Sequence, residues 1–286
     1  MQNCINSYHR TGHPVYGGAY ESVSCLGAMY KYYNYLANRS EEIALADIPE
    51  KTIEKIVRKA REDKRHFLLA HEAQAIMKAA RIPVPQSRVA RTLNEAVQYS
   101  GEIGYPVVMK IASKDIIHKS DAGGVALNLE NSNEVIDAYQ AIMQSCRAYN
   151  PNAKIEGVDV LEMARPGTEL IIGARRDKVF GPIVMFGLGG IYVEVMKDIS
   201  FRAFPLNHRE ITNMIKEVKS YPLLLGVRGE KKKDIDGIMD TIIKLGTIIK
   251  KCEAISDIEI NPLVAYEEGE GVKALDVRIL LLKGER

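Results

Sequence analysis

Helix-type and strand-type patterns alternate along the middle of this chain, and this alternation constrains the fold more than any other feature. Between residues 67 and 150, apolar positions recur first with the helical period, then with the strand period, and then switch again. Strands that alternate with helices are typical of α/β domains, in which helices cover a sheet. The sequence therefore predicts an α/β lobe here.

Four regions follow from the same patterns. Residues 1–45 form an N-terminal extension with a helix over residues 20–37, whose apolar face docks on the chain or a partner, or binds a ligand through its tyrosines. Residues 46–66 form a charged linker with another helix, residues 67–154 a first lobe, and residues 155–286 a second lobe with more strand. We expect further helices over residues 67–80, 93–100, 133–148 and 234–252, and strands over residues 107–111, 125–129, 158–162, 169–174, 182–186, 191–195, 254–263 and 272–282, the last two as a hairpin.

Composition argues against several classes of protein. Among 286 residues, 46 % are apolar and 27 % charged, and the net charge of +2 has its signs interspersed, so no extended face for nucleic acid stands out. No apolar run approaches the roughly 20 residues of a membrane span, and the N-terminus lacks the apolar core of a signal peptide. Four widely spaced cysteines suit a reducing compartment. We expect a cytoplasmic protein that binds neither nucleic acid nor membranes.

The stretch from residue 105 to residue 125 carries the clearest chemical signal. Lys110 ends a β-branched, strand-like run, where its charge is costly without a counter-ion; a nucleotide triphosphate or an ordinary glutamate would both serve. A donor-rich turn that includes Ser113 follows and closes on Gly123 and Gly124. Because glycine has no Cβ, the amides of this pair can approach phosphate oxygens. No Walker A motif occurs, and a Gly-Gly pair alone is also common in hairpins.

His118 lies among the polar residues of this turn. It is either an ordinary surface histidine or a nucleophile for phosphorus, since imidazole is nucleophilic at neutral pH without an activating base. In the second case a phosphoryl group would leave the nucleotide through a side chain.

Two further segments are candidates for binding. Residues 161–169 place a strand end before a Pro-Gly turn, which suits a hinge whose backbone reads an adenine edge while Glu169 binds ribose hydroxyls; the alternative is a solvated strand end. Asp257, Glu259 and Asn261 share one face of a strand, and Asp276 on the returning strand could lie opposite Asn261. Such oxygens suit Mg²⁺ with phosphates and water, or else a polar strand facing solvent.

Several of these motifs resemble a known family. Residues 105–110, 118–125, 180–198, 257–263 and 275–278 are similar to the ATP-grasp subunit of ADP-forming acyl-CoA synthetases, the acetate–CoA ligases related to succinyl-CoA synthetase. The motifs are long and ordered, and the resemblance covers the chain from about residue 67 to its end.

The resemblance implies an ATP-grasp fold whose two α/β lobes clasp the nucleotide. Its reaction converts acyl-CoA, phosphate and ADP reversibly into carboxylic acid, CoA and ATP. The cofactors are ATP or ADP and Mg²⁺, and the family's metal-binding pair matches Asn261 and Asp276. Lys110 would hold the nucleotide phosphates, and Glu162 and Met163 would line the adenine hinge, with Glu169 at the ribose.

The resemblance also implies a phosphoryl relay. An acyl phosphate forms first, then a phosphohistidine on the CoA-binding alpha part, and His118 matches the family's second phosphohistidine, which carries the group to ADP. Asp257 or Glu259 would orient it, and Glu194 would steady the incoming histidine.

The N-terminal segment, residues 12–32, resembles the closing helix of the alpha part that precedes the linker in fused enzymes. We therefore expect the C-terminal piece of such a fusion, active in a hetero-oligomer with a CoA-binding alpha subunit on a separate chain. The alternatives are a truncated, non-catalytic fragment that binds nucleotide or a partner, and a regulatory ATP-grasp module of a protein acyltransferase. The sequence does not identify the acyl group.

Overall fold

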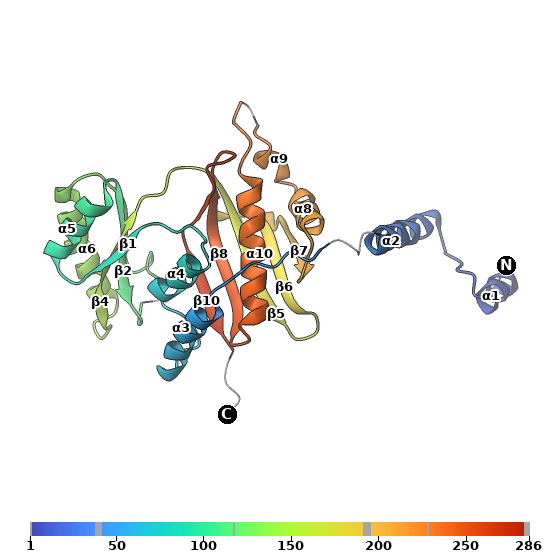
Figure 1. The fold of residues 1–286 in the computed structure, drawn as a ribbon, viewed down its shortest axis with the longest axis horizontal. Coiled ribbons are helices and arrows are strands. Elements are labelled where there is room, and N and C mark those ends of the chain that lie inside the picture. The colour runs from blue at the N-terminus through green and yellow to red at the C-terminus, as the bar shows by residue number, and fades with distance from the viewer. Residues whose placement is uncertain (1, 38–41, 117, 191–195, 228, 283–286) are drawn as a thin grey trace. The chain divides into compact units, whose positions relative to one another are not determined.

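The computed structural model describes residues 2–37, 42–116, 118–190, 196–227 and 229–282. It divides the chain into two units, Met1–Ile43 and Ala44–Arg286. The larger unit contains two antiparallel sheets with helices packed on them (Figure 1).

The first sheet has four strands in the order β1-β4-β2-β3, and every neighbouring pair is antiparallel. Helices α5 and α6 pack on one face, where Met109, Ile111, Val158 and Val160 are fully buried. Period-two alternation puts Lys110 and Asp159 on the other face. The elements are β1 (Ser87–Ala90), α5 (Leu93–Ile103), β2 (Val107–Ser113), β3 (Val125–Leu129), α6 (Ser132–Tyr149) and β4 (Ile155–Glu162).

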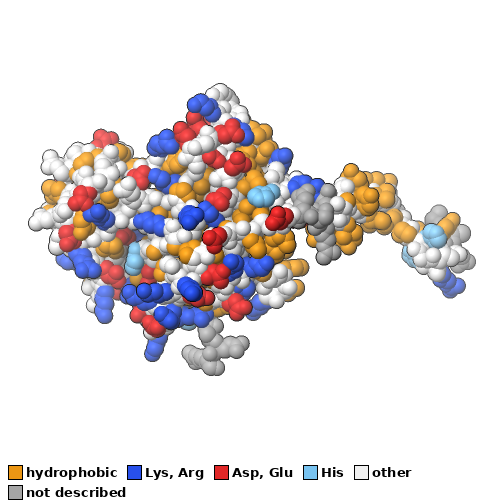
Figure 2. All heavy atoms as spheres, viewed as in Figure 1, with side chains coloured by type: hydrophobic (Ala, Val, Ile, Leu, Met, Phe, Trp, Pro, Cys, Tyr) orange, Lys and Arg blue, Asp and Glu red, His pale blue; other side chains and the backbone are white. Residues whose placement is uncertain are grey.

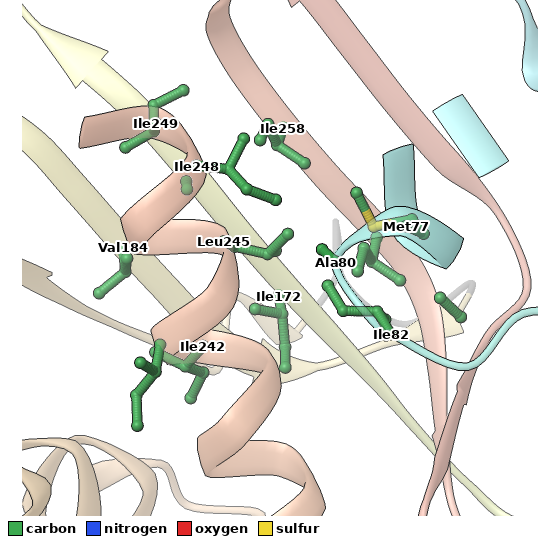
Figure 3. Packing of buried hydrophobic residues seen from close by; sticks show 14 of the residues in the cluster. Met77, Ala80, Ile82, Ile172, Val184, Ile242, Leu245, Ile248, Ile249 and Ile258 are labelled. Atoms are coloured by element: carbon green, nitrogen blue, oxygen red, sulfur yellow. The ribbon is translucent and has the colours of Figure 1, made fainter. Parts of the chain in front are cut away.

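The second sheet is six-stranded, with the order β10-β8-β5-β6-β7 and β9 paired to β8. Its strands are β5 (Thr168–Asp177), β6 (Gly181–Leu188), β7 (Ile199–Ala203), β8 (Ile255–Ala265), β9 (Val272–Ala274) and β10 (Val277–Leu281). One face forms the larger core with several helices: α3 (Glu50–Glu62), α4 (Ala70–Ala79), α8 (His208–Glu217), α9 (Tyr221–Leu224) and α10 (Ile235–Lys251). Figure 3 shows Leu245 and Ile248 of α10 pointing towards Ile172 and Ile258 of the sheet.

The hairpin near the C-terminal end of the chain has the apolar–polar alternation of a strand with one buried face. Ile258 and Ile260 are 2 % and 0 % exposed in the core, so the polar residues between them lie on the opposite face. The predicted hairpin is correct, but its second arm is split into β9 and β10 by Leu275 and Asp276. This break brings Asp276 out of the ladder and next to β8.

The structure differs from the predicted elements at several places. The helix predicted from residue 67 begins at Ala70, because Leu68 donates its N–H to Ile279 O at 3.0 Å and extends the edge of the sheet. Strand β4 belongs to the first sheet, so the change of sheet falls at residues 163–167, after the predicted lobe boundary at 154/155. The patterns of β7 and α8 were not recognised, and the strand predicted over residues 191–195 lies outside the described residues.

The N-terminal unit contains α1 (Gln2–Arg10) and α2 (Ala19–Ala37). The predicted helix over residues 20–37 is therefore correct. None of the residues of α2 is buried, although the helix carries five tyrosines. Its docking partner stays a prediction.

Charged side chains of both signs intermingle over the visible face of the larger unit (Figure 2). None of the described helices is long and apolar enough to cross a membrane.

Candidate nucleotide site

A pocket lies where the first sheet meets the split arm of the C-terminal hairpin. The polar groups that line it come from four elements and two connecting segments: His71 and Gln74 of α4, Ser87 of β1, Lys110 of β2, Lys119 of the following turn, Asp159 of β4, and Asp276 between β9 and β10. Ala70, Leu161, Leu275 and Val277 complete its wall. Two lysines, a histidine and an amide facing two carboxylates form a site for a polyanion that carries a cation.

Lys110 and Asp159 form the floor of the pocket. They are directly opposite each other on β2 and β4, so their side chains leave the sheet on the same face. Burial raises the pKa of the Asp159 carboxyl, although the neighbouring cations Lys119, His71 and Lys110 act in the opposite direction. Lys110 was predicted for this role, and the structure places it in the pocket.

The turn after β2 places Lys119 in the pocket, and the backbone amides of its two glycines make hydrogen bonds within the turn. The N–H of Gly123 donates to Ser120 O at 3.0 Å, and the N–H of Gly124 donates to Lys119 O at 2.7 Å. Both amides are bonded within the folded turn, and the contact of this pair with phosphate stays a prediction. Gly123 also has a φ of +64°, which favours glycine.

Ser113, the last residue of β2, and His118, in the turn that follows, do not line the pocket. The hydroxyl of Ser113 donates to Lys154 O at 2.9 Å and accepts from the N–H of Asp115 at 3.2 Å, so it organises the loop. The His118 side chain is exposed, directly before Lys119, and no hydrogen bond or ion pair involves it among the described residues. The imidazole is therefore open to solvent one residue before a lysine that lines the pocket, and its role as a phosphoryl carrier stays a prediction.

The predicted hinge joins the two sheets. Glu162 ends β4, and its carboxylate pairs with Lys273 at 2.6 Å and accepts from the N–H of Gln86 at 3.1 Å. Burial opposes ionisation of the Glu162 carboxyl, but these two contacts have the larger combined effect and lower its pKa. The N–H of Met163 donates to Pro106 O at 3.2 Å. The amide of Met163 and the carboxylate of Glu162 are thus engaged in holding the connection, and any contact of this segment with adenine stays a prediction.

The two predicted metal ligands are neighbours. The N–H of Asn261 donates to Asp276 O at 3.1 Å, which confirms that these residues lie opposite each other across the hairpin. The Oδ1 of Asn261 also accepts from the N–H of Gly190 at 3.0 Å. Glu169 reaches the same place, since a Cβ on Gly190 would lie 2.1 Å from its Oε2. Asn261 and Glu169 thus both reach Gly190, and Asp276 is joined to Asn261 through the backbone.

The remaining predicted carboxylates are distributed differently. Asp257 forms an ion pair with Arg175 of β5, and Glu259 lies between Asp257 and Asn261 on the same face of β8. No hydrogen bond or ion pair joins either carboxylate to His118 among the described residues. Glu194 lies outside the described residues.

Sequence reasoning missed four members of the pocket: His71, Gln74, Ser87 and Asp159. Ser87 donates to Oε1 of Gln74 at 2.6 Å, which leaves the Gln74 NH₂ as a donor on the wall. Asp159 had a signal, because a carboxylate between two valines breaks an apolar strand. His71 had none, since a polar residue on an amphipathic helix is ordinary.

A buried ion pair fixes the start of α4 and therefore the place of His71. Arg65 holds Glu72 through two contacts of 2.7 and 2.8 Å, and both side chains are 9 % exposed. Glu72 also accepts from the N–H of Leu69 at 2.9 Å, which caps the helix. One carboxylate thus secures the helix terminus that lines the pocket.

The residues present fit a magnesium ion that arrives with a nucleotide. Asp276 and Asn261, a carboxylate and an amide, are neighbours through a backbone hydrogen bond, and Mg²⁺ would complete its shell with phosphates and water. No group of three or more His, Cys, Asp or Glu side chains suited to a metal occurs in the described part of the chain. An ion here would therefore depend on its nucleotide for ligands.

Comparison with known proteins agrees with this geometry. The model of the ATP-grasp domain family matches residues 59–281. The beta subunit of acetate–CoA ligase (ADP-forming) I of Pyrococcus furiosus is 49 % identical over 226 residues, which are 79 % of this chain and 96 % of that subunit. A 4-hydroxybutyrate–CoA ligase (ADP-forming) of Nitrosopumilus maritimus is 41 % identical over 266 residues, which are 93 % of this chain and 38 % of that protein.

A solved structure is similar as well. It is the dinucleotide forming acetyl-coenzyme A synthetase 1 of Ca. Korarchaeum cryptofilum with coenzyme A and Mg-AMPPCP, whose phosphohistidine segment points towards the nucleotide-binding site. The TM-score is 0.71 at 44 % identity, covering 80 % of this chain and all of that one. The present chain therefore belongs to the ATP-grasp domain family, and within it to the family of beta subunits of ADP-forming acetate–CoA ligases.

Proposed function

We propose that this chain is the nucleotide-binding, phosphoryl-transferring subunit of an ADP-forming acyl-CoA synthetase. The observation that carries the proposal is the pocket lined by Lys110, Lys119 and Asp276, with Asn261 bonded through its backbone to Asp276. Lysines hold phosphate oxygens and a carboxylate–amide pair holds Mg²⁺, so the two sides of the pocket match the two parts of a metal–nucleotide complex. The bound Mg²⁺ would offset charge on the phosphates.

In this proposal His118 is the phosphoryl carrier. An imidazole nitrogen attacks phosphorus, a P–N bond forms, and the P–O bond to the leaving group breaks; the reverse step moves the phosphoryl group onto ADP. The side chain is exposed beside the pocket, so the same turn can present it to ADP and to a donor on another chain. Of the two carboxylates predicted to orient it, Glu259 is favoured, because Arg175 already engages Asp257.

We further propose that a CoA-binding alpha part on a separate chain supplies the phosphoryl group. The chain spans 38 % of the length of its Nitrosopumilus relative but 96 % of the Pyrococcus beta subunit. The 266 residues shared with the former exceed the length of the unit Ala44–Arg286, so that similarity reaches into the N-terminal extension. This supports the interpretation of the extension as the closing segment of an alpha part.

Calorimetric titration with ADP and Mg²⁺ tests the nucleotide role. Lys110→Met should weaken binding at least about tenfold, because a charge-assisted phosphate contact is lost. Lys114→Met is the matched control, since Lys114 pairs with Glu156 at 3.7 Å on the surface and does not line the pocket. A wild-type chain that binds no nucleotide, or equal losses in both variants, would contradict the proposal. Binding without phosphoryl transfer would instead favour a non-catalytic nucleotide-binding module.

A further inference from the structure

Asp159 is one of two carboxylates in a pocket whose cations suit an anion, and unlike Asp276 it is not a member of the predicted metal-binding pair. It stands opposite Lys110 on the neighbouring strand and shares the pocket with Lys119 and His71. A carboxylate at this place repels phosphate, so it requires an explanation beyond packing.

The carboxylate does not serve as the fixed partner of a lysine. No hydrogen bond or ion pair within 4.0 Å involves the side chains of Asp159, Lys110 or Lys119 among the described residues. In contrast, Lys231 and Lys273 are each paired with a glutamate, at 2.8 and 2.6 Å. The pocket cations are therefore left available for a ligand, and Asp159 acts on that ligand through its charge.

The ligand's net charge then decides how much Asp159 matters. Metal-free ADP or ATP brings its full negative charge next to the carboxylate. A bound divalent cation would cancel two of those charges, and Asp276, which also lines the pocket, is the carboxylate proposed to hold it. On the basis of the proposed nucleotide site, we propose that Asp159 is a specificity-determining residue, which favours binding of metal-bound nucleotide over the metal-free form.

The size of the effect follows from Coulomb's law for a ligand charge close to the carboxylate. A unit charge at about 6 Å in a partly screened pocket changes affinity by about ten- to a hundredfold. Asp159→Asn keeps the shape of the side chain and removes the charge. It should tighten metal-free ADP by about tenfold or more and change MgADP by less than about threefold.

The test is a set of four dissociation constants. Wild type and Asp159→Asn are titrated with ADP in EDTA and with ADP in excess Mg²⁺, by calorimetry at one pH and ionic strength. Glu156→Gln is the control, because Glu156 lies on the same strand, pairs with Lys114 and does not line the pocket. Its ratio of metal-free to metal-bound affinity should stay within about twofold of wild type.

Four results would overturn the role of Asp159. If Asp159→Asn weakens MgADP alone, the residue is a metal ligand. If it weakens both forms equally, it positions the lysines. If neither form changes, or Glu156→Gln changes the ratio equally, the charge at this position is irrelevant.

Inorganic tripolyphosphate separates this inference from the proposed function. If the wild type binds tripolyphosphate but no nucleotide, the nucleotide role fails, while the preference of Asp159 for the metal-bound polyphosphate is still measured. A wild type that binds neither refutes both.

Discussion

Replacing Gly124 with alanine tests whether the Gly123–Gly124 pair shapes its turn or contacts phosphate. A Cβ at Gly124 would lie 2.6 Å from Cγ2 of Ile111, 3.0 Å from Sγ of Cys146 and 3.0 Å from the carbonyl oxygen of Lys119. Ordinary carbon–carbon contacts are about 3.5–4.0 Å, so the neighbours must move by about 1 Å. Ile111 and Cys146 are both fully buried and have no room to do so.

The expected cost follows from overpacking of this kind, which destabilises by about 1–3 kcal/mol. Since two of the clashing atoms are fully buried and the third is backbone, we expect the upper half of that range, about 2–3 kcal/mol. The free energy of unfolding is measured by urea denaturation followed by circular dichroism. MgADP affinity should also fall, because the displaced turn carries Lys119 into the pocket.

Gly101→Ala is the matched control. Gly101 lies in α5, and a Cβ added there would meet no atom within 4 Å beyond the backbone of its own helix, so alanine should stabilise by about 0.5–1 kcal/mol. If Gly124→Ala leaves the free energy of unfolding unchanged but abolishes nucleotide binding, the steric argument is wrong. The glycine would then serve close approach of the phosphate.

Three further predictions concern the carboxylates. Glu72→Gln breaks the buried pair with Arg65 and should cost about 3 kcal/mol. Burial opposes ionisation of Glu72, but Arg65 and the N–H of Leu69 lower the pKa of its carboxyl below the ordinary value of 4.5. The ion pair therefore stabilises the fold above pH 4.5, and this contribution is lost as the pH falls below that value. In urea unfolding, the free energy of unfolding of the variant should depend less on acid pH than that of the wild type. Asp276→Ala should remove the effect of Mg²⁺ on ADP affinity while metal-free binding persists, and equal Mg²⁺ dependence in variant and wild type would argue against the metal role. Glu259→Gln should slow phosphorylation of the chain by about tenfold while Asp257→Asn does not, as followed by quenched-flow labelling, and the opposite order would assign orientation to Asp257.

Local patterns predicted most of the fold because they are set by neighbours in sequence. The alternation of Ile258 and Ile260 with polar residues gave the strand, its buried face and the pairing with Asp276. The 3.6-residue period gave α10 over nearly its full length. The start of α4 was missed because Leu68 bonds to Ile279, a contact between residues far apart in sequence.

For the candidate site as well, the residues with a local sequence pattern were predicted and those placed by distant contacts were not. Lys110 was found because a charge interrupts an apolar strand, and Asn261 and Asp276 because they lie on a polar strand face and beside it. Gly124 was also found, but the partners of its amide and the atoms around its Cα could not be predicted, because they depend on how the turn closes. Asp159 reaches the pocket through the pairing of β4 with β2, a sheet order that periodicity alone does not determine.

Phosphorylation of His118 tests the central claim most directly. Purified chain is incubated with Mg²⁺ and ATP labelled at the γ-phosphate, and protein-bound label is assayed for the acid lability and base stability of a phosphohistidine. Wild type and His208→Ala, a control at an exposed histidine of α8, should both be labelled, and His118→Ala should not. Label that persists in His118→Ala, or a wild type that binds MgATP yet acquires no label, would contradict the relay.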